Sequence, residues 1–145
     1  LKNRKKIILR NPKATRPWQH VLEPLSGYLT LGHKLINKEL KSKLIPSWNF
    51  GPYKKNCKKV NFIVQLFIKE WGEKKQKIIF ERNKNFYESK LLSLNINKAK
   101  KELLWEPRLT LRETIKFTGD WYKNYFLDKD VEDITNYQIE NYIDK

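Results

Sequence analysis

The sequence predicts an α/β fold in which helices predominate over a few short strands, because segments of helical periodicity alternate with short apolar runs. The strand-type runs lie at 5–9, 47–51, 77–81 and 91–94. The helical segments lie at 21–36, 60–71, 97–106, 110–126 and from 135 onward. A chain of 145 residues is long enough for one domain with a core. We therefore expect a single domain over residues 1–145.

The expected strands are rich in β-branched, leucine or aromatic residues and are bounded by turn residues. The run "KKIIL" ends at Asn11-Pro12, and "SWNFG" ends at Gly51-Pro52, so both have a clear stop. The run "SWNFG" has the composition of a buried strand. The last two runs flank a loop at 82–90.

The first two helices differ in how much of their surface is apolar. Over 21–36 the apolar residues recur at helical spacing, and Pro24 is tolerated because it lies in the first turn. The stretch "VNFIVQLFIKEW" (60–71) is apolar almost all round, which is typical of a helix covered on more than one side. We therefore expect this second helix to be packed between other elements.

Capping residues mark the later helices. Asn97 can cap a short helix that ends before Pro107, because the residue ahead of a proline disfavours the helical conformation. In "TLRE", Thr110 and Glu113 form a capping box, in which each side chain satisfies a free backbone donor.

A second capping box is expected in "ITNYQIENYI". There Thr135 and Gln138 would form the box, and Ile134 against Ile139 would form a hydrophobic staple. This pattern predicts a last helix that begins at 135.

The composition limits the classes of partner and compartment. The net charge of +15 favours nucleic acid only weakly, since 25 of the 31 basic residues are Lys, whereas base and bidentate phosphate recognition favour Arg. The Lys residues are scattered, so we interpret the charge as a solvated surface and expect no nucleic-acid partner. The longest apolar run is too short to cross a bilayer and no leader is recognisable, which predicts a cytoplasmic protein without membrane contact. Cys57 is the only cysteine, so an internal disulfide and a cysteine-based zinc site are excluded.

The sequence does not match the familiar nucleotide-binding and catalytic motifs. No two of the five glycines lie within four positions of each other, so a dinucleotide-binding turn is missing. The stretch Gly27–Lys34 differs from a P-loop because His33 separates Gly32 from Lys34. The pair Tyr125 and Lys129 has the spacing of a short-chain dehydrogenase pair, but it lies at a helix end beside aspartates. Two histidines are too few for a multi-histidine metal site, and we expect no metal.

The stretch "NPKATRPWQHVLEP" (11–24) combines residues with compatible roles. Arg16 offers a planar fork of donors suited to a phosphate, and it precedes a helix N-terminus, although a salt bridge would equally explain it. Trp18 can form the wall of a pocket or pack in the core. His20 and Glu23 lie where a helix start needs hydrogen-bond partners, so we interpret both as structural.

The segment "RNPKATRPWQHVLEPLSGYL" (10–29) resembles the corresponding segment of CDP-glucose 4,6-dehydratases, members of the extended short-chain dehydrogenase/reductase family. Further matches follow in the same order: "WNFGP" (48–52), "WG" (71–72), "NKAKKELLWEPR" (97–108) and "TLRETIKFTGDWYKNYF" (110–126). The likeness covers nearly the whole chain. It implies that the chain is the carboxyl-terminal, substrate-binding portion of such an enzyme, a fragment that lacks the amino-terminal Rossmann part.

The resemblance also assigns binding residues. Arg16 would hold the substrate diphosphate, and the backbone of Ile8, Leu9 and Arg10 would line the nucleobase. The loop before "LLSL" would close on the substrate through Tyr87 and Glu88. Many relatives place an Arg near position 87, so the second phosphate contact is not assigned by this sequence.

The implied reaction belongs to the whole enzyme. In that family NAD takes hydride from sugar C4, water is eliminated across C5–C6, and the hydride returns to C6. The groups that do this chemistry would precede Leu1, so no catalytic residue is expected in this chain, and NAD would be bound mainly by the missing part. The implied partners are a CDP-sugar, the upstream Rossmann domain or chain, and a second copy in a homodimer, and the implied role is deoxysugar and lipopolysaccharide O-antigen biosynthesis.

Three alternatives stay open at this point. The chain can belong to another sugar-nucleotide dehydratase or epimerase of the same superfamily. It can also be a separately encoded, non-catalytic half that binds nucleotide or completes an enzyme. A basic nucleic-acid-binding module, suggested by charge alone, is the third alternative.

Overall fold

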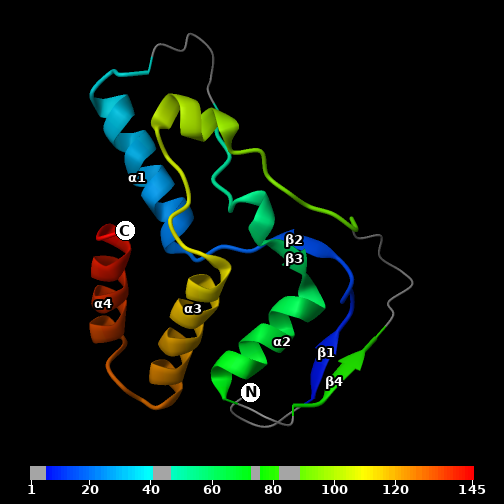
Figure 1. Cartoon of the computed structure of the whole chain (residues 1–145). Helices are drawn as coiled ribbons and strands as arrows, with labels where there is room; N and C mark the ends of the chain where they lie inside the picture. The colour runs from blue at the N-terminus through cyan, green and yellow to red at the C-terminus, as the bar shows by residue number, and fades with distance from the viewer. Residues whose placement is uncertain (1–5, 41–46, 73–75, 82–88) are drawn as a thin grey trace.

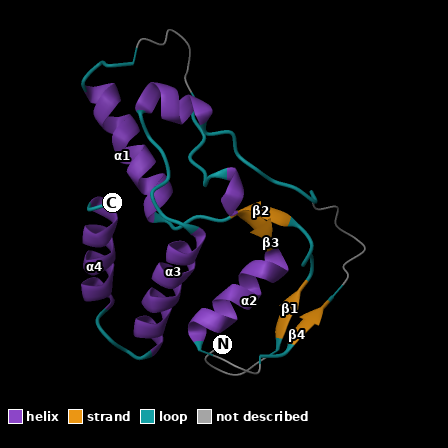
Figure 2. Ribbon diagram, viewed as in Figure 1, coloured by secondary structure: helices purple, strands orange, loops and turns teal. Residues whose placement is uncertain are grey.

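Helices form most of the structure, and two pairs of short strands lie to one side of them (Figures 1 and 2). The structure is a computed structural model that describes residues 6–40, 47–72, 76–81 and 89–145. Its elements in chain order are β1 (Ile7–Leu9), β2 (Thr15–Pro17), α1 (Leu22–Ile36), the 3₁₀ turn η1 (Lys54–Asn56), β3 (Cys57–Lys59), α2 (Val60–Trp71), β4 (Ile78–Phe80), the π-helical turn η2 (Ala99–Leu103), α3 (Leu111–Phe126) and α4 (Val131–Ile143). The predicted class, mostly helical with a few short strands, is confirmed.

The strands join segments that are far apart in the sequence. Strand β1 pairs in parallel with β4, with Leu9 opposite Phe80. Strand β2 pairs antiparallel with β3, with Arg16 opposite Lys58. Strands β1 and β4 lie within the expected runs 5–9 and 77–81, whereas β2 and β3 carry too little apolar character to be predicted.

Helices α4, α3 and α2 lie side by side with α3 in the middle, and α1 extends above them towards η2 (Figure 1). Helices α1, α2 and α3 begin and end within one residue of the predicted segments. The capping box of α3 is confirmed. The backbone N–H of Glu113 donates to Oγ1 of Thr110 (3.3 Å), and the backbone N–H of Thr110 donates to the Glu113 carboxylate (2.7 Å).

The main apolar core lies between α1, η2 and the chain around Phe50. Its buried members are Phe50, Ile96, Ala99, Leu103 and Trp105. The rings of Phe50 and Trp105 meet edge to face, with centroids 5.0 Å apart. Helix α1 approaches Phe50 at Gly27, where any Cβ atom would overlap the Phe50 ring. The core therefore depends on a glycine in the middle of α1.

The predicted strands at 47–51 and 91–94 are wrong. A strand needs a neighbouring strand for its backbone groups, and the described residues offer none to either segment. A side chain bonds to the backbone of the first segment instead: Gln19 Nε2 donates to the carbonyl oxygen of Phe50 (3.0 Å). Only Leu91 forms a bridge, with Thr15.

Two predicted helix starts are also wrong. Helix α4 begins at Val131, capped by Asp130, whose Oδ1 accepts from the backbone N–H of Glu132 (2.8 Å). Thr135 lies inside the helix, where its hydroxyl donates to the carbonyl oxygen of Val131 (2.6 Å), so the expected box and staple do not mark the start. For the helical turn at 97–103, the cap is not Asn97 but Asn95, whose Oδ1 accepts from the backbone N–H of Asn97 (3.0 Å). In each case a side chain further upstream caps the helix instead of the predicted one.

The described residues cover helix α2 only in part. Of its residues Ile63 is buried, whereas 48% of Phe62 is exposed, because one face borders an open groove. Helix α1 carries an exposed apolar stripe, formed by Leu25, Tyr28, Leu29, Leu35 and Ile36. In the described part of the chain, no helix is both long and apolar enough to span a bilayer.

Candidate functional site

The largest hollow among those lined by the described residues is a groove of about 1050 Å³ between the β1–β4 pair, the β2–β3 pair and the start of α2. Its wall is formed by Arg10, Asn11, Pro12, Lys13, Ala14, Lys59, Asn61, Phe62, Gln65, Phe80, Glu81 and Lys90. The groove lies at the carboxyl ends of two parallel strands. Ligands of α/β proteins bind preferentially at such ends.

Backbone hydrogen bonds hold the loop 10–14 against the start of α2. The N–H of Val60 donates to the carbonyl oxygen of Ala14 (2.9 Å), and the N–H of Asn61 donates to that of Pro12 (3.0 Å). At the other side, the N–H of Glu81 donates to the carbonyl oxygen of Leu9 (3.0 Å). The wall is therefore assembled from three chain segments that are fixed to one another.

The groove is electropositive. Four cationic side chains line it, namely Arg10, Lys13, Lys59 and Lys90, against the single carboxylate of Glu81 in the described wall. A cleft lined by one sign of charge concentrates ligands of the opposite charge. The wall is suited to an anionic ligand such as a phosphate ester.

Arg16 lies beside this groove rather than in its wall. Its Nη1 donates to the carbonyl oxygens of Thr15 (3.0 Å) and Ser89 (2.9 Å). Ser89 precedes Lys90, which lines the groove, and the backbone N–H of Thr15 donates to the carbonyl oxygen of Lys90 (2.9 Å). The two contacts fix one edge of the guanidinium at the cationic end of the groove.

Of the expected nucleobase segment, only Arg10 is part of the described wall of this groove, and Ile8 and Leu9 precede it in β1. Leu9 is buried, Ile8 is exposed, and Arg10 lines the hollow directly. Tyr87 and Glu88, the expected second side of the site, lie outside the described residues. The structure thus places Arg16 beside the groove and Arg10 in its wall, and the binding roles of Arg16, Ile8, Leu9 and Arg10 stay predictions.

Trp18 packs against a strand and does not border the groove. Its Nε1 donates to the carbonyl oxygen of Lys58 in β3 (2.9 Å). Of the two roles that the sequence left open, the structure supports packing.

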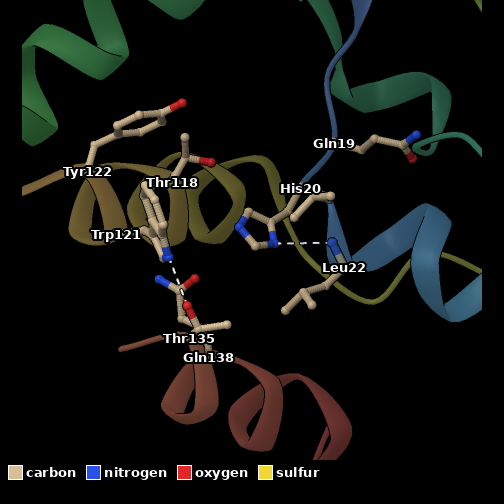
Figure 3. Close-up of a pocket in the computed structure, with 9 residues that line it drawn as sticks. Gln19, His20, Leu22, Thr118, Trp121, Tyr122, Thr135 and Gln138 are labelled. Carbon is tan, nitrogen blue, oxygen red and sulfur yellow. Dashed lines mark hydrogen bonds between the residues drawn. The ribbon is translucent and has the colours of Figure 1, made fainter. Parts of the chain in front are cut away.

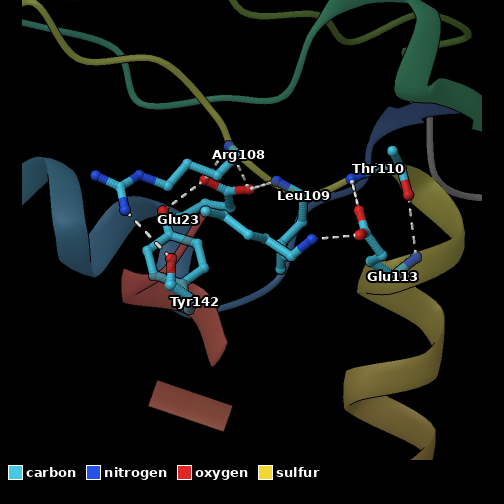
Figure 4. A network of polar contacts seen from close by, with 7 residues as sticks. Glu23, Arg108, Leu109, Thr110, Glu113 and Tyr142 are labelled. Atoms are coloured by element: carbon cyan, nitrogen blue, oxygen red, sulfur yellow. Dashed lines mark hydrogen bonds and ion pairs between the residues drawn. The ribbon is translucent and has the colours of Figure 1, made fainter. Parts of the chain in front are cut away.

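Glu23 is a structural residue, as expected (Figure 4). Only 1% of its surface is exposed, and its carboxylate accepts hydrogen bonds from the backbone N–H groups of Arg108 (3.0 and 3.1 Å) and Leu109 (2.7 Å). The hydroxyl of Tyr142 donates a further hydrogen bond (2.8 Å). A buried carboxylate with this many donors is satisfied by its hydrogen bonds. Glu23 therefore joins α1, the chain before α3, and α4.

His20 borders a second, smaller cavity of about 390 Å³ between α1, α3 and α4 (Figure 3). Its Nδ1 accepts from the backbone N–H of Leu22 (3.4 Å), and burial lowers the pKa of the imidazole. The polar groups opposite are paired with each other or with backbone: Trp121 Nε1 donates to Thr135 Oγ1 (2.9 Å), and Gln138 Nε2 donates to a carbonyl oxygen of α3 (2.7 Å). No charged side chain lines this cavity in the described chain, so it does not fit an anion.

Several wall residues of the large groove carry no signal in the sequence. Asn61, Gln65 and Glu81 belong to no motif, and Phe62 and Phe80 are ordinary members of apolar segments. The pairing of β1 with β4, 71 residues later, brings Phe80 and Glu81 to this groove, and α2 supplies Asn61, Phe62 and Gln65. Phe62 (48% exposed) and Phe80 (60% exposed) border the groove, and no pattern in the sequence predicts that these apolar side chains are exposed.

No group of three His, Cys, Asp or Glu side chains within 6–40, 47–72, 76–81 and 89–145 could hold a metal ion. The thiol of Cys57 is partly buried, and burial raises its pKa, which disfavours the nucleophilic thiolate.

The amino-acid sequence is similar to CDP-glucose 4,6-dehydratase of Salmonella typhimurium. The two are 36% identical over 141 residues, which cover 97% of this chain and 38% of that enzyme. The chain thus spans well under half the length of this relative. No family model matches the sequence.

Solved structures share the fold. The dTDP-glucose 4,6-dehydratase of Bacillus anthracis, in complex with NAD, superposes with a TM-score of 0.69 at 24% identity, over 85% of this chain and 36% of that one. The UDP-glucuronic acid 4-epimerase of Bacillus cereus, in complex with UDP-glucuronic acid and NAD, gives 0.68 at 19% identity, over 86% and 37%. At these identities the likeness establishes the fold.

Proposed function

Since the chain is homologous to a portion of CDP-glucose 4,6-dehydratase and has part of the extended short-chain dehydrogenase/reductase fold, we propose that it forms the sugar-nucleotide-binding part of an NAD-dependent CDP-glucose 4,6-dehydratase. The homology covers nearly the whole chain, and the groove supplies a place for the ligand. The observation that carries the proposal is this electropositive groove at the carboxyl ends of β1 and β4.

The groove has the parts that a nucleoside diphosphate needs. Lys59 and Lys90 lie at the end where Arg16 is anchored, and they would neutralise the diphosphate together with the guanidinium. The exposed rings of Phe62 and Phe80 offer flat apolar surfaces on which a base can stack. We place the nucleobase against Ile8, Leu9 and Arg10. Tyr87 and Glu88 would close on the sugar nucleotide from the loop before Ser89.

The residues that the structure describes do not fit NAD. A dinucleotide site requires a glycine-rich turn between a strand and a helix of a parallel sheet, and the described strands form only two two-stranded sheets. Gly27 and Gly119 lie inside helices, and Gly72 ends one. We place NAD and the reacting groups in another part of the enzyme, and derive no chemical step from this chain.

The partner in this proposal is that NAD-binding part, as a domain or a separate chain. Helix α1 has an exposed apolar stripe, in which 76% of Leu29 and 82% of Ile36 are uncovered. This stripe supports the proposal that the NAD-binding part packs against α1. The enzyme would act in cytoplasmic deoxysugar biosynthesis for lipopolysaccharide, and its full form would be a homodimer.

The test is calorimetric titration of this chain with CDP, using UDP, dTDP and GDP as comparators, at two salt concentrations. We expect CDP to bind, and to bind more tightly than the other three. Equal binding of all four nucleotides, falling steeply with salt, would indicate a non-specific basic surface and would contradict the proposal. Preference for UDP or dTDP would favour another sugar-nucleotide enzyme of the same fold.

A further inference from the structure

Glu81 is the one carboxylate in the described wall of the large groove. It follows β4 directly, and its backbone N–H donates to the carbonyl oxygen of Leu9 (3.0 Å), so its position is fixed relative to β1. Among the residues that the structure describes, no side chain or backbone group hydrogen-bonds to its carboxylate. An acceptor that faces a ligand groove in this way is available to a donor on the ligand.

The surroundings of Glu81 differ from the rest of the groove. Phe80 precedes it, and Phe62 borders the same hollow from α2. Phe62 and Phe80 are both exposed, and neither ring stacks on another aromatic side chain within the described chain. Flat apolar surfaces beside an acceptor suit a heterocyclic base that carries an amino group.

The distribution of charge orients a nucleotide in the groove. A carboxylate repels phosphate, whereas Lys59 and Lys90 attract it with no carboxylate beside them in the described wall. Arg10, the residue after Leu9, lies on the Glu81 side, where the carboxylate offsets its positive charge. Lys59 and Lys90 both neighbour Thr15 of β2, through strand pairing and a backbone hydrogen bond. Glu81 neighbours Leu9 of β1 through a backbone hydrogen bond, and Leu9 precedes Thr15 by six residues. A nucleoside diphosphate would therefore place its phosphates near β2 and its base near Glu81.

We propose that Glu81 selects cytosine over uracil by accepting a hydrogen bond from the exocyclic amino group of the base; this inference rests on the proposed function. Cytosine presents an N4 amino donor at the position where uracil presents the O4 carbonyl acceptor. Carboxylates accept hydrogen bonds from this amino group where proteins read bases. Opposite uracil, two acceptors would face each other, and the carboxylate would lose water without gaining a partner.

The test compares the dissociation constants of CDP and UDP for the unmodified chain and for Glu81→Gln, by calorimetry. We expect the unmodified chain to prefer CDP about tenfold or more. A Gln amide can donate to uracil O4 or accept from cytosine N4, so the preference should fall to near one in Glu81→Gln. Circular dichroism and the urea midpoint would verify that the variant folds. Glu140→Gln, which removes an exposed carboxylate on α4, is the matched control and should keep the preference.

The outcomes separate the two proposals. If the unmodified chain prefers CDP and Glu81→Gln keeps the same preference, the role of Glu81 is overturned and the proposed function stands. If the unmodified chain binds CDP and UDP equally, cytosine selection by Glu81 is overturned, while nucleotide binding remains. If neither pyrimidine nucleotide binds, the proposed function fails, and cytosine selection fails with it.

Discussion

The hydroxyl of Tyr142 donates a hydrogen bond to Oε2 of Glu23 at 2.8 Å, and this contact joins the last helix to the first across 119 residues. Burial, together with the Glu23 carboxylate, raises the pKa of the Tyr142 hydroxyl to about 12, so it remains a donor at neutral pH. Because Glu23 also holds the backbone before α3, the pair links α1, α3 and α4.

Replacing Tyr142 by Phe should therefore destabilise the chain. The variant loses a hydrogen bond to a buried charge, which is worth about 1.5–3 kcal/mol. Urea unfolding followed by circular dichroism would measure the loss. Tyr137→Phe removes an exposed hydroxyl from the same helix and should change the free energy of unfolding by less than about 0.5 kcal/mol. Equal effects in the two variants would show that the Glu23 contact does not stabilise α4.

Two glycines of α1 should respond to alanine in opposite directions. A Cβ atom at Gly27 would overlap the ring of Phe50, and overpacking of this kind costs about 1–3 kcal/mol. No atom lies near a Cβ at Gly32, so Gly32→Ala should stabilise the chain by roughly 0.5–1 kcal/mol through helix propensity. Thermal unfolding of both variants would measure the difference. Stabilisation by Gly27→Ala would mean that α1 does not pack against Phe50 as described.

His20 should make the chain less stable in mild acid. Burial lowers the pKa of its imidazole below the usual 6.5, so the unfolded state takes up the proton more readily than the folded state. The contribution is fully present above about pH 6.5 and is lost as the pH falls towards the lowered pKa.

The free energy of unfolding, measured from pH 7 to 5, should therefore fall in the unmodified chain. His20→Asn, whose Oδ1 can accept from the N–H of Leu22, should reduce this slope. His33→Gln removes a largely exposed histidine and should leave the slope unchanged. A slope that His20→Asn does not reduce would assign the pH effect to other groups.

The capping box of α3 gives a second pH dependence at lower pH. The Lys145 ammonium, followed by hydrogen bonds from Thr110, lowers the pKa of Glu113 to about 2. Because the folded pKa is depressed, the stabilisation is present above about pH 4.5 and is lost as the pH falls towards 2. Glu113→Gln should flatten the stability profile in this interval, and Thr110→Ala should cost about 1 kcal/mol at neutral pH. Denaturant midpoints from pH 2 to 7 would reveal both effects, with Glu140→Gln as the control.

Arg16→Ala should weaken the binding of CDP by about 1.5–3 kcal/mol, the range for hydrogen bonds to charged groups. Arg112→Ala removes the same charge from the exposed face of α3 and should leave the affinity unchanged at moderate salt. Calorimetric titration of the two variants provides the comparison. An unchanged affinity in Arg16→Ala would contradict the diphosphate role of Arg16, because the side chain would then make no contact that contributes to CDP binding.

The sequence alone determined the features that depend on local spacing. The periodicity of 21–36, 60–71 and 110–126 predicted three helices, and the capping box of Thr110 and Glu113 predicted where one of them begins. These features are local because a helix satisfies its backbone hydrogen bonds within a few residues. The segment 10–29 also indicated the relationship to sugar-nucleotide enzymes, through residues that are adjacent in the chain.

Tertiary structure alone decided where strands form and which side chains share the groove. A strand forms only when another strand is near enough to pair with it. The run at 47–51 has no such neighbour among the described residues, whereas the weakly apolar segment 15–17 pairs with β3 and forms β2. Glu81 and Arg10 lie far apart in the sequence and line the same groove because β1 and β4 pair in parallel. This arrangement depends on hydrogen bonds between distant segments, which the spacing of residues along the chain does not encode.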